Sequence, residues 1–269
     1  KTRGNVLDPL QLIEQYGTDA LRFALTTGTS PGNDQRLSES KLEASRNFAN
    51  KLWNATRFVL GSPSTGSGQA PSTSSGHGLE AGRGLDGWYN LPSLTHREDR
   101  WIVSRLNRVT HAANRFLQDY QFGEAQREIH DFLWGEFCDW YIEMAKIRIR
   151  EGKEPSPLPV LAHTLERTLR LLHPFMPFIT EELWQHLRRT LPGTEGLPGS
   201  IVVAPYPTAE EHRLDPQAEE QMLRVIELVR AIRNARAELH IDLNRPIEAV
   251  VEAAGFRGVV QEEAEAIRT

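Results

Sequence analysis

The stretch Arg46–Leu60, RNFANKLWNATRFVL, decides how the rest of the chain is interpreted. Wound as an α-helix at about 100° per residue, it separates into an apolar face and a polar face. The apolar face carries Leu42 from the preceding turn with Ala49, Leu52, Trp53, Thr56, Val59 and Leu60. The polar face carries Asn47, Asn50, Lys51 and Asn54, with Phe58 among them. The pattern predicts a helix buried along one side, with one aromatic ring among amides and a cation on the other.

Phe58 has two interpretations. Large apolar side chains are common at protein surfaces, and a following loop can cover such a ring. Alternatively, the ring is a stacking platform for an unpaired base, beside amides that bond base edges and a lysine that reaches the backbone. The helix by itself leaves both interpretations open.

Composition limits how RNA could be bound. The 269 residues include 31 Lys and Arg against 36 Asp and Glu, a net charge of −5. A protein that coats itself in nucleic acid is strongly basic, so any RNA contact here must be a local patch. Such a patch surrounds the opening helix, where only Glu39 and Glu43 oppose Arg36, Lys41, Arg46, Lys51 and Arg57. The alternative is a solvated helix face, which charge runs usually are.

Other sequence features favour a cytoplasmic chain that has no complete active site of its own. Cys138 is the only cysteine, which excludes an internal disulfide and a multi-cysteine zinc site. No long apolar run or signal peptide is present, so we expect no membrane partner and a cytoplasmic location. The sequence contains no phosphate loop, HExxH, Gly-x-Ser-x-Gly or CxxC motif. We therefore expect no complete active site and no metal site.

Helical spacing of apolar residues predicts a mainly α fold, a helical bundle. Thr95 and Glu98 fit a capping box before one helix, and a long helix is expected through Trp140 to about Gly152. The two prolines of His173–Pro177 predict a kink, after which Thr180 caps a short helix. Residues 61–87 are rich in Gly and Ser and are interpreted as a flexible insertion.

Towards the end of the chain the pattern changes. Ile201–Ala204 is predicted to be an edge strand, and Ile247–Glu252 a strand before a helix over Val259–Ile267. One strand and one helix cannot close a core, so we expect a truncated small α/β piece at the C-terminus. The preceding helix carries arginines that either form a solvated face or touch RNA backbone. These are Arg224, Arg230, Arg233 and Arg236.

Several motifs together resemble the valine branch of the class I aminoacyl-tRNA synthetases. They are KTRGNVLDP at the start, the continuation to Leu25, PGNDQR before the opening helix, the opening helix itself, DRWIVSRL, WGEFCDWYIEMAK, HPFMPFITEELW and IRNARAE. Lys1 and Thr2 resemble the last two positions of the KMSKS loop, with Thr2 where that family usually has Ser. The leucine and isoleucine enzymes share HPFMPFITEELW and the DWYIE run.

The resemblance implies a C-terminal fragment of a valine–tRNA ligase. Residues 1–35 would be the end of the KMSKS loop with connecting helices of the catalytic core. Residues 36–212 would be the anticodon-binding helical bundle, and 213–269 a long helix with the start of an α/β subdomain. The HIGH motif, nucleotide fold and editing domain are not in this sequence, so the fragment alone is expected to be inactive.

The resemblance also implies partners and roles. Lys1 would be the catalytic lysine that stabilises the triphosphate when ATP, with Mg, reacts with valine; the fragment itself would need no cofactor. The anticodon loop of tRNA(Val) would meet Lys51, Asn54 and Phe58, supported by Arg36, Arg46, Asn50 and Arg57. A monomer is expected.

Three alternatives remain at this stage. The chain could be a helical interaction module that reuses this fold without binding RNA, or the isoleucine or leucine relative. It could also be an unrelated soluble enzyme, against which the missing nucleophile–base and metal sets count.

Overall fold

The computed structural model describes residues 8–28, 37–61, 91, 93–242, 245–251 and 255–268. Within these ranges the chain is helical and contains no strand, which confirms the predicted α-helical bundle. The α-helices are α1 (Pro9–Tyr16), α2 (Thr18–Thr26), α3 (Glu39–Leu60), α4 (Arg97–Gln118), α5 (Phe122–Asp131), α6 (Ile142–Glu151), α7 (Leu158–Leu172), α8 (Pro177–Thr190), α9 (Pro216–Glu238), α10 (Arg257–Glu262) and α11 (Ala264–Arg268). Short 3₁₀ turns occupy Ile201–Val203 and Glu211–Arg213.

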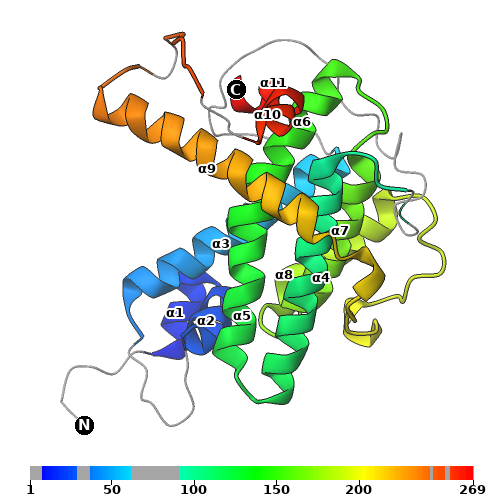
Figure 1. Cartoon of the computed structure of the whole chain (residues 1–269). Helices are drawn as coiled ribbons and strands as arrows, with labels where there is room; N and C mark the ends of the chain where they lie inside the picture. The colour runs from blue at the N-terminus through cyan, green and yellow to red at the C-terminus, as the bar shows by residue number, and fades with distance from the viewer. Residues whose placement is uncertain are drawn as a thin grey trace.

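The helices pack around one main core. α9 packs against α4, α1 and α2 lie beneath the start of α3, and α10 and α11 lie beside α6 (Figure 1). Trp184, Tyr141 and Phe48 are among the largest fully buried side chains. A smaller apolar cluster joins α1 and α2 to Leu42 of α3.

α5 and α6 are joined without a break by a π-helix, Phe132–Tyr141. The sequence predicts a single helix here. A π-helix bonds each N–H five residues back instead of four, so its side chains leave the 3.6-residue period. Trp140, which the period places with the inward residues, is for this reason only half-buried.

A buried ion network fixes this long helix against α4. Arg148 Nη1 donates to Glu98 Oε1 at 2.9 Å and to Asp99 Oδ1 at 2.7 Å. Tyr141 donates its hydroxyl proton to the same Asp99 oxygen at 2.7 Å. Burial and the Asp99 carboxylate raise the pKa of Tyr141 well above its ordinary value, so the hydroxyl remains a donor.

The predicted capping box of Thr95 and Glu98 is wrong, because Glu98 takes part in the buried ion network. α4 begins at Arg97 with His96 at the N-cap position, and no side chain caps it. Glu98 is buried and its carboxylate bonds Arg148 instead of the backbone N–H that a capping box requires.

Asp19 holds α2 against the start of α8. Its carboxylate accepts from the backbone N–H of Ile179 at 2.6 Å and of Phe178 at 3.3 Å. These N–H groups belong to the first turn of α8 and have no partner within that helix. Arg22 adds a bond to the Pro174 carbonyl at 3.3 Å. The small α1–α2 unit is thereby tied to the bundle by hydrogen bonds as well as apolar contact.

The proline segment separates α7 from α8, as the sequence predicts, and Pro177 occupies the first turn of α8. Thr180, however, is not a cap. It lies inside α8 and donates to the Met176 carbonyl at 2.7 Å.

Both predicted strands are wrong. A 3₁₀ turn occupies Ile201–Val203, where the sequence favours an edge strand. Residues 247–251 likewise have no strand partner in the described chain. The insertion predicted from the Gly- and Ser-rich composition lies, over residues 62–87, outside the described residues.

None of the helices in the described ranges is long and apolar enough to cross a membrane.

Replacing Arg148 tests the ion network. Arg148→Met leaves the Glu98 and Asp99 carboxylates buried without their cation, which should lower the free energy of unfolding by about 3–5 kcal/mol. Urea denaturation followed by circular dichroism measures the loss. Arg150→Met, at an exposed position of the same helix, is the control. Equal losses in the two variants would contradict a structural role for the network.

Candidate nucleic-acid interface

α3 forms the centre of the candidate interface. Its first turn is capped by Ser38, which accepts from Lys41 N, and it ends at Gly61, whose φ of +69° favours glycine. Leu42, Leu52 and Val59 are buried, as the helical pattern predicts. Phe48 is also buried and stacks on Phe23 with ring centroids 4.9 Å apart, a contact that the predicted apolar face does not include.

Asn50, Asn54 and Phe58 follow one another at four-residue spacing and lie on one side of α3. We call them the α3 row. Asn50 and Asn54 are exposed, and neither amide bonds another residue of the described chain. Phe58 is half-buried and packs against the core, with the Lys146 ammonium 5.4 Å from its ring centroid. The ring is thus partly covered by protein but not enclosed in the bundle.

Lys51 does not lie free beside this row. Its ammonium is 2.5 Å from Asp139 Oδ1 and 4.0 Å from the centroid of the Trp134 ring. Both partners come from the π-helix, and Asp139 is 88 residues further along the chain. The pair presents a cation and a carboxylate side by side, so it offers hydrogen-bond donors and acceptors together.

The remaining predicted contacts are only partly brought together. Arg46 is exposed near the start of α3, with its guanidinium 5.7 Å from the Tyr16 ring centroid. Arg57 is half-buried near the end of the same helix. Lys1 and Arg36 lie outside the described residues. The described members of the set therefore share α3, with the arginines flanking the row.

A second basic group lies next to Lys51. Trp140 of the π-helix has the guanidinium carbons of Arg230 and Arg233 at 5.7 Å and 5.4 Å from its ring centroid. A pocket of ≈ 460 Å³ is lined by Lys51, Cys138, Asp139, Trp140, Glu143, Arg230 and Arg233. Burial raises the pKa of the Cys138 thiol to about 12, so the thiol stays protonated and acts as apolar lining.

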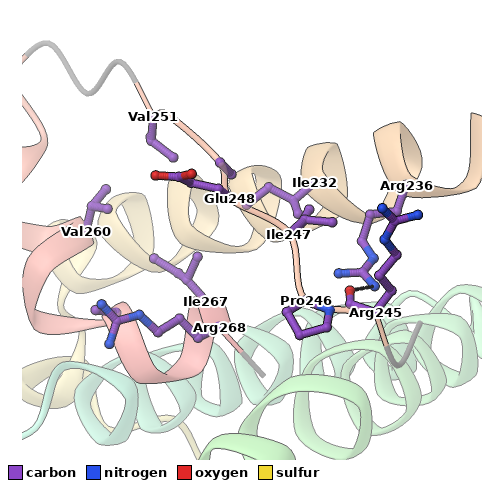
Figure 2. A pocket seen from close by; sticks show the side chains of 12 residues that line it. Ile232, Arg236, Arg245, Pro246, Ile247, Glu248, Val251, Val260, Ile267 and Arg268 are labelled. Carbon is purple, nitrogen blue, oxygen red and sulfur yellow. Dashed lines mark hydrogen bonds between the residues drawn. The ribbon is translucent and has the colours of Figure 1, made fainter. Parts of the chain in front are cut away.

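The four α9 arginines differ in their partners. Arg224 pairs with Glu220 at 2.5 Å. Arg236 donates to the Arg245 carbonyl at 2.8 Å, at one end of a pocket of ≈ 620 Å³ between α9 and the C-terminal segment (Figure 2). Arg230 and Arg233 form no ion pair with any carboxylate in the described ranges. Of the four, these two therefore remain available to an outside anion in the part of the chain that the structure describes.

Residues 99–251 match the family described as the anticodon-binding domain of tRNA ligase. This is more than half of the chain, and the chain belongs to that family. Among curated proteins it is similar to valine–tRNA ligases. It is 52% identical to that of Dehalococcoides mccartyi strain CBDB1 over 97% of this chain and 27% of the relative. It is 44% identical to that of Symbiobacterium thermophilum over 94% of this chain and 27% of the relative.

The chain thus spans about a quarter of the length of these relatives. Among solved structures, the fold resembles a ternary LeuRS–tRNA–LeuAMS complex from Agrobacterium radiobacter K84. The TM-score is 0.53 at 22% sequence identity, over 80% of this chain and 23% of that one. This likeness supports the fold alone.

The candidate interface includes Asp139 and Trp140, which the sequence does not single out for binding, and two of the four α9 arginines, which the sequence offers only as a set. Asp139 and Trp140 lie in a run that helical spacing assigns to a core-facing helix, and Arg230 and Arg233 are not separable by sequence from Arg224 and Arg236. The spacing of apolar residues does not show which lysines and arginines form ion pairs with residues of other helices.

A double-mutant cycle on Lys51→Ala and Asp139→Ala tests whether this pair can open. Both side chains are partly exposed, at 26% and 46%, so solvent screening should limit their coupling to about 0.2–1 kcal/mol. Unfolding free energies of the two single variants and the double variant give the coupling. A value as large as that of a buried pair, such as Arg148 with Asp99, would mean that Lys51 is held for structural reasons.

Proposed function

We propose that the α3 row binds the anticodon loop of a tRNA, and that the chain is the tRNA-binding part of a valine–tRNA ligase. That enzyme would attach valine to tRNA(Val) using ATP. The single observation that carries the proposal is the pair of exposed amides, Asn50 and Asn54, which bond no other residue in the described chain and lie in line with the half-buried Phe58 ring. Membership in the family of anticodon-binding domains supports a tRNA as the ligand of the row.

The chemistry of each side chain suggests its role. Phe58 stacks on a base turned out of the loop, because single-stranded RNA is recognised largely through stacking on aromatic rings. Asn50 and Asn54 bond base edges, since each amide supplies donors and an acceptor. Lys51, with Asp139, meets a base acceptor or a phosphate, and Arg46 and Arg57 hold phosphates. Arg36 would join them from outside the described residues.

The catalytic part of the proposal needs other portions of the enzyme besides Lys1. Lys1 would act on the triphosphate of ATP in a complete active site, and the proposal leaves this chain alone without ligase activity. In the described ranges no group of three or more His, Cys, Asp or Glu side chains is placed to hold a metal, so Mg is assigned no residue here. Residues 1–35, 36–212 and 213–269 are proposed as the core connection, the anticodon-binding bundle and the start of a further subdomain. The chain would act as a monomer in the cytoplasm.

Phe58→Ala tests the stacking role. Loss of the ring should weaken tRNA(Val) binding by about 1–3 kcal/mol, the usual cost of one base–aromatic stack. A gel-shift titration measures affinity. Phe178→Ala is the matched control, because Phe178 is an exposed ring on α8 outside the α3 row. Unchanged affinity in Phe58→Ala, with intact folding, would remove the ring from the site.

An anticodon swap tests the ligand. The chain should bind tRNA(Val) more tightly than the same transcript with its anticodon bases replaced, because base edges carry sequence information and phosphates do not. The comparison is made at moderate salt, where attraction to phosphates is screened. Equal affinities would leave only nonspecific binding and would contradict anticodon recognition.

A further inference from the structure

Arg230 and Arg233 are exposed cations held in a defined place. They lie on one side of α9, three residues apart, and both guanidinium groups lie over the Trp140 ring. A guanidinium stacked on an aromatic ring keeps its N–H edge free, and that edge matches two phosphate oxygens. The ring thus preorganises two long side chains that would otherwise lose rotamer freedom on binding an anion.

Two carboxylates line the pocket together with these arginines, and each is paired with a lysine. Asp139 pairs with Lys51 at 2.5 Å, and Glu143 pairs with Lys146 at 2.7 Å. Both acids line the same pocket as the two arginines. After these pairings, the charge left at the pocket is that of Arg230 and Arg233. The pocket lining therefore carries more positive than negative charge, on a chain whose net charge is −5.

Lys51 links the pocket to the α3 row, because it lies beside Asn50 and Asn54 on α3 and also lines the pocket. Its volume of ≈ 460 Å³ admits a phosphodiester group, since one water takes about 30 Å³ of the liquid. A strand of RNA that lies along the row can therefore place its backbone against α9.

We propose that Arg230 and Arg233, positioned by Trp140, bind a backbone phosphate of the same RNA whose bases meet the α3 row. This inference rests on the proposed function. It assigns the α9 pair to affinity and orientation, and leaves base discrimination to α3. Trp140 is a positioning residue that acts through the two guanidinium groups.

The test is a salt titration of tRNA binding by the 269-residue chain, comparing the wild type with Arg230→Ala/Arg233→Ala. The double variant should bind cognate and anticodon-swapped tRNA about ten-fold more weakly at low salt, by the same factor for each. The slope of log K against log salt should become shallower by about 0.7–0.9 for each phosphate that the variant no longer neutralises. Arg230→Lys/Arg233→Lys should restore most of the slope, because the positive charges remain.

Arg224→Ala is the matched control, an exposed arginine on the same helix that is already paired with Glu220. If the α9 double variant matches this control in affinity and slope while anticodon preference persists, the α9 proposal is wrong and the α3 function stands. If the double variant loses slope but the chain shows no anticodon preference, the α9 arginines bind RNA phosphate without sequence preference, and the α3 function is wrong. No binding of tRNA by the wild type would overturn both.

Discussion

The buried guanidinium of Arg148 is the constraint on which the surface depends. It bonds Glu98 and Asp99 of α4 from a position on α6, and Tyr141 at the end of the π-helix joins the same carboxylate. A carboxylate pair in an apolar core is costly unless a cation and hydrogen bonds accompany it. The network therefore favours the observed alignment of the long helix against α4, in which Trp134, Asp139 and Trp140 are only partly buried or exposed.

The π-helix carries this alignment to the candidate binding surface. Its altered period turns Trp134 and Asp139 towards α3, where they hold Lys51, and presents Trp140 to the arginines of α9. π-Helical segments are rare and occur frequently at functional sites. Three helices distant in sequence thereby contribute to the candidate surface. α3 supplies the amides and the Phe58 ring, and α9 supplies two arginines. The π-helix supplies Asp139 and two tryptophans that contact Lys51 and the arginines.

The sequence predicts the α3 row because the row depends only on helical spacing. Leu42 and Leu52 mark the buried side, so Asn50 and Asn54 must face elsewhere, whereas helical spacing does not predict that Phe58 also packs against the core. The partner of Lys51 could not be predicted, since Asp139 is 88 residues away and reaches it only through tertiary packing. The capping box predicted at Glu98 failed for a similar reason, because Glu98 bonds the buried Arg148, which lies 50 residues later in the chain. The predicted strands failed because short β-prone runs need a partner strand, and the described chain provides none.

Crosslinking can locate an anticodon base on the protein itself. An anticodon stem–loop of tRNA(Val) carrying 4-thiouridine at an anticodon position is crosslinked by near-ultraviolet light to the bound chain, and the attached peptide is identified by mass spectrometry. We expect attachment within residues 50–58 of α3, with the π-helix residues beside Lys51 as the next neighbours. Attachment confined to α1, α8 or the C-terminal helices would contradict recognition of the anticodon by the α3 row.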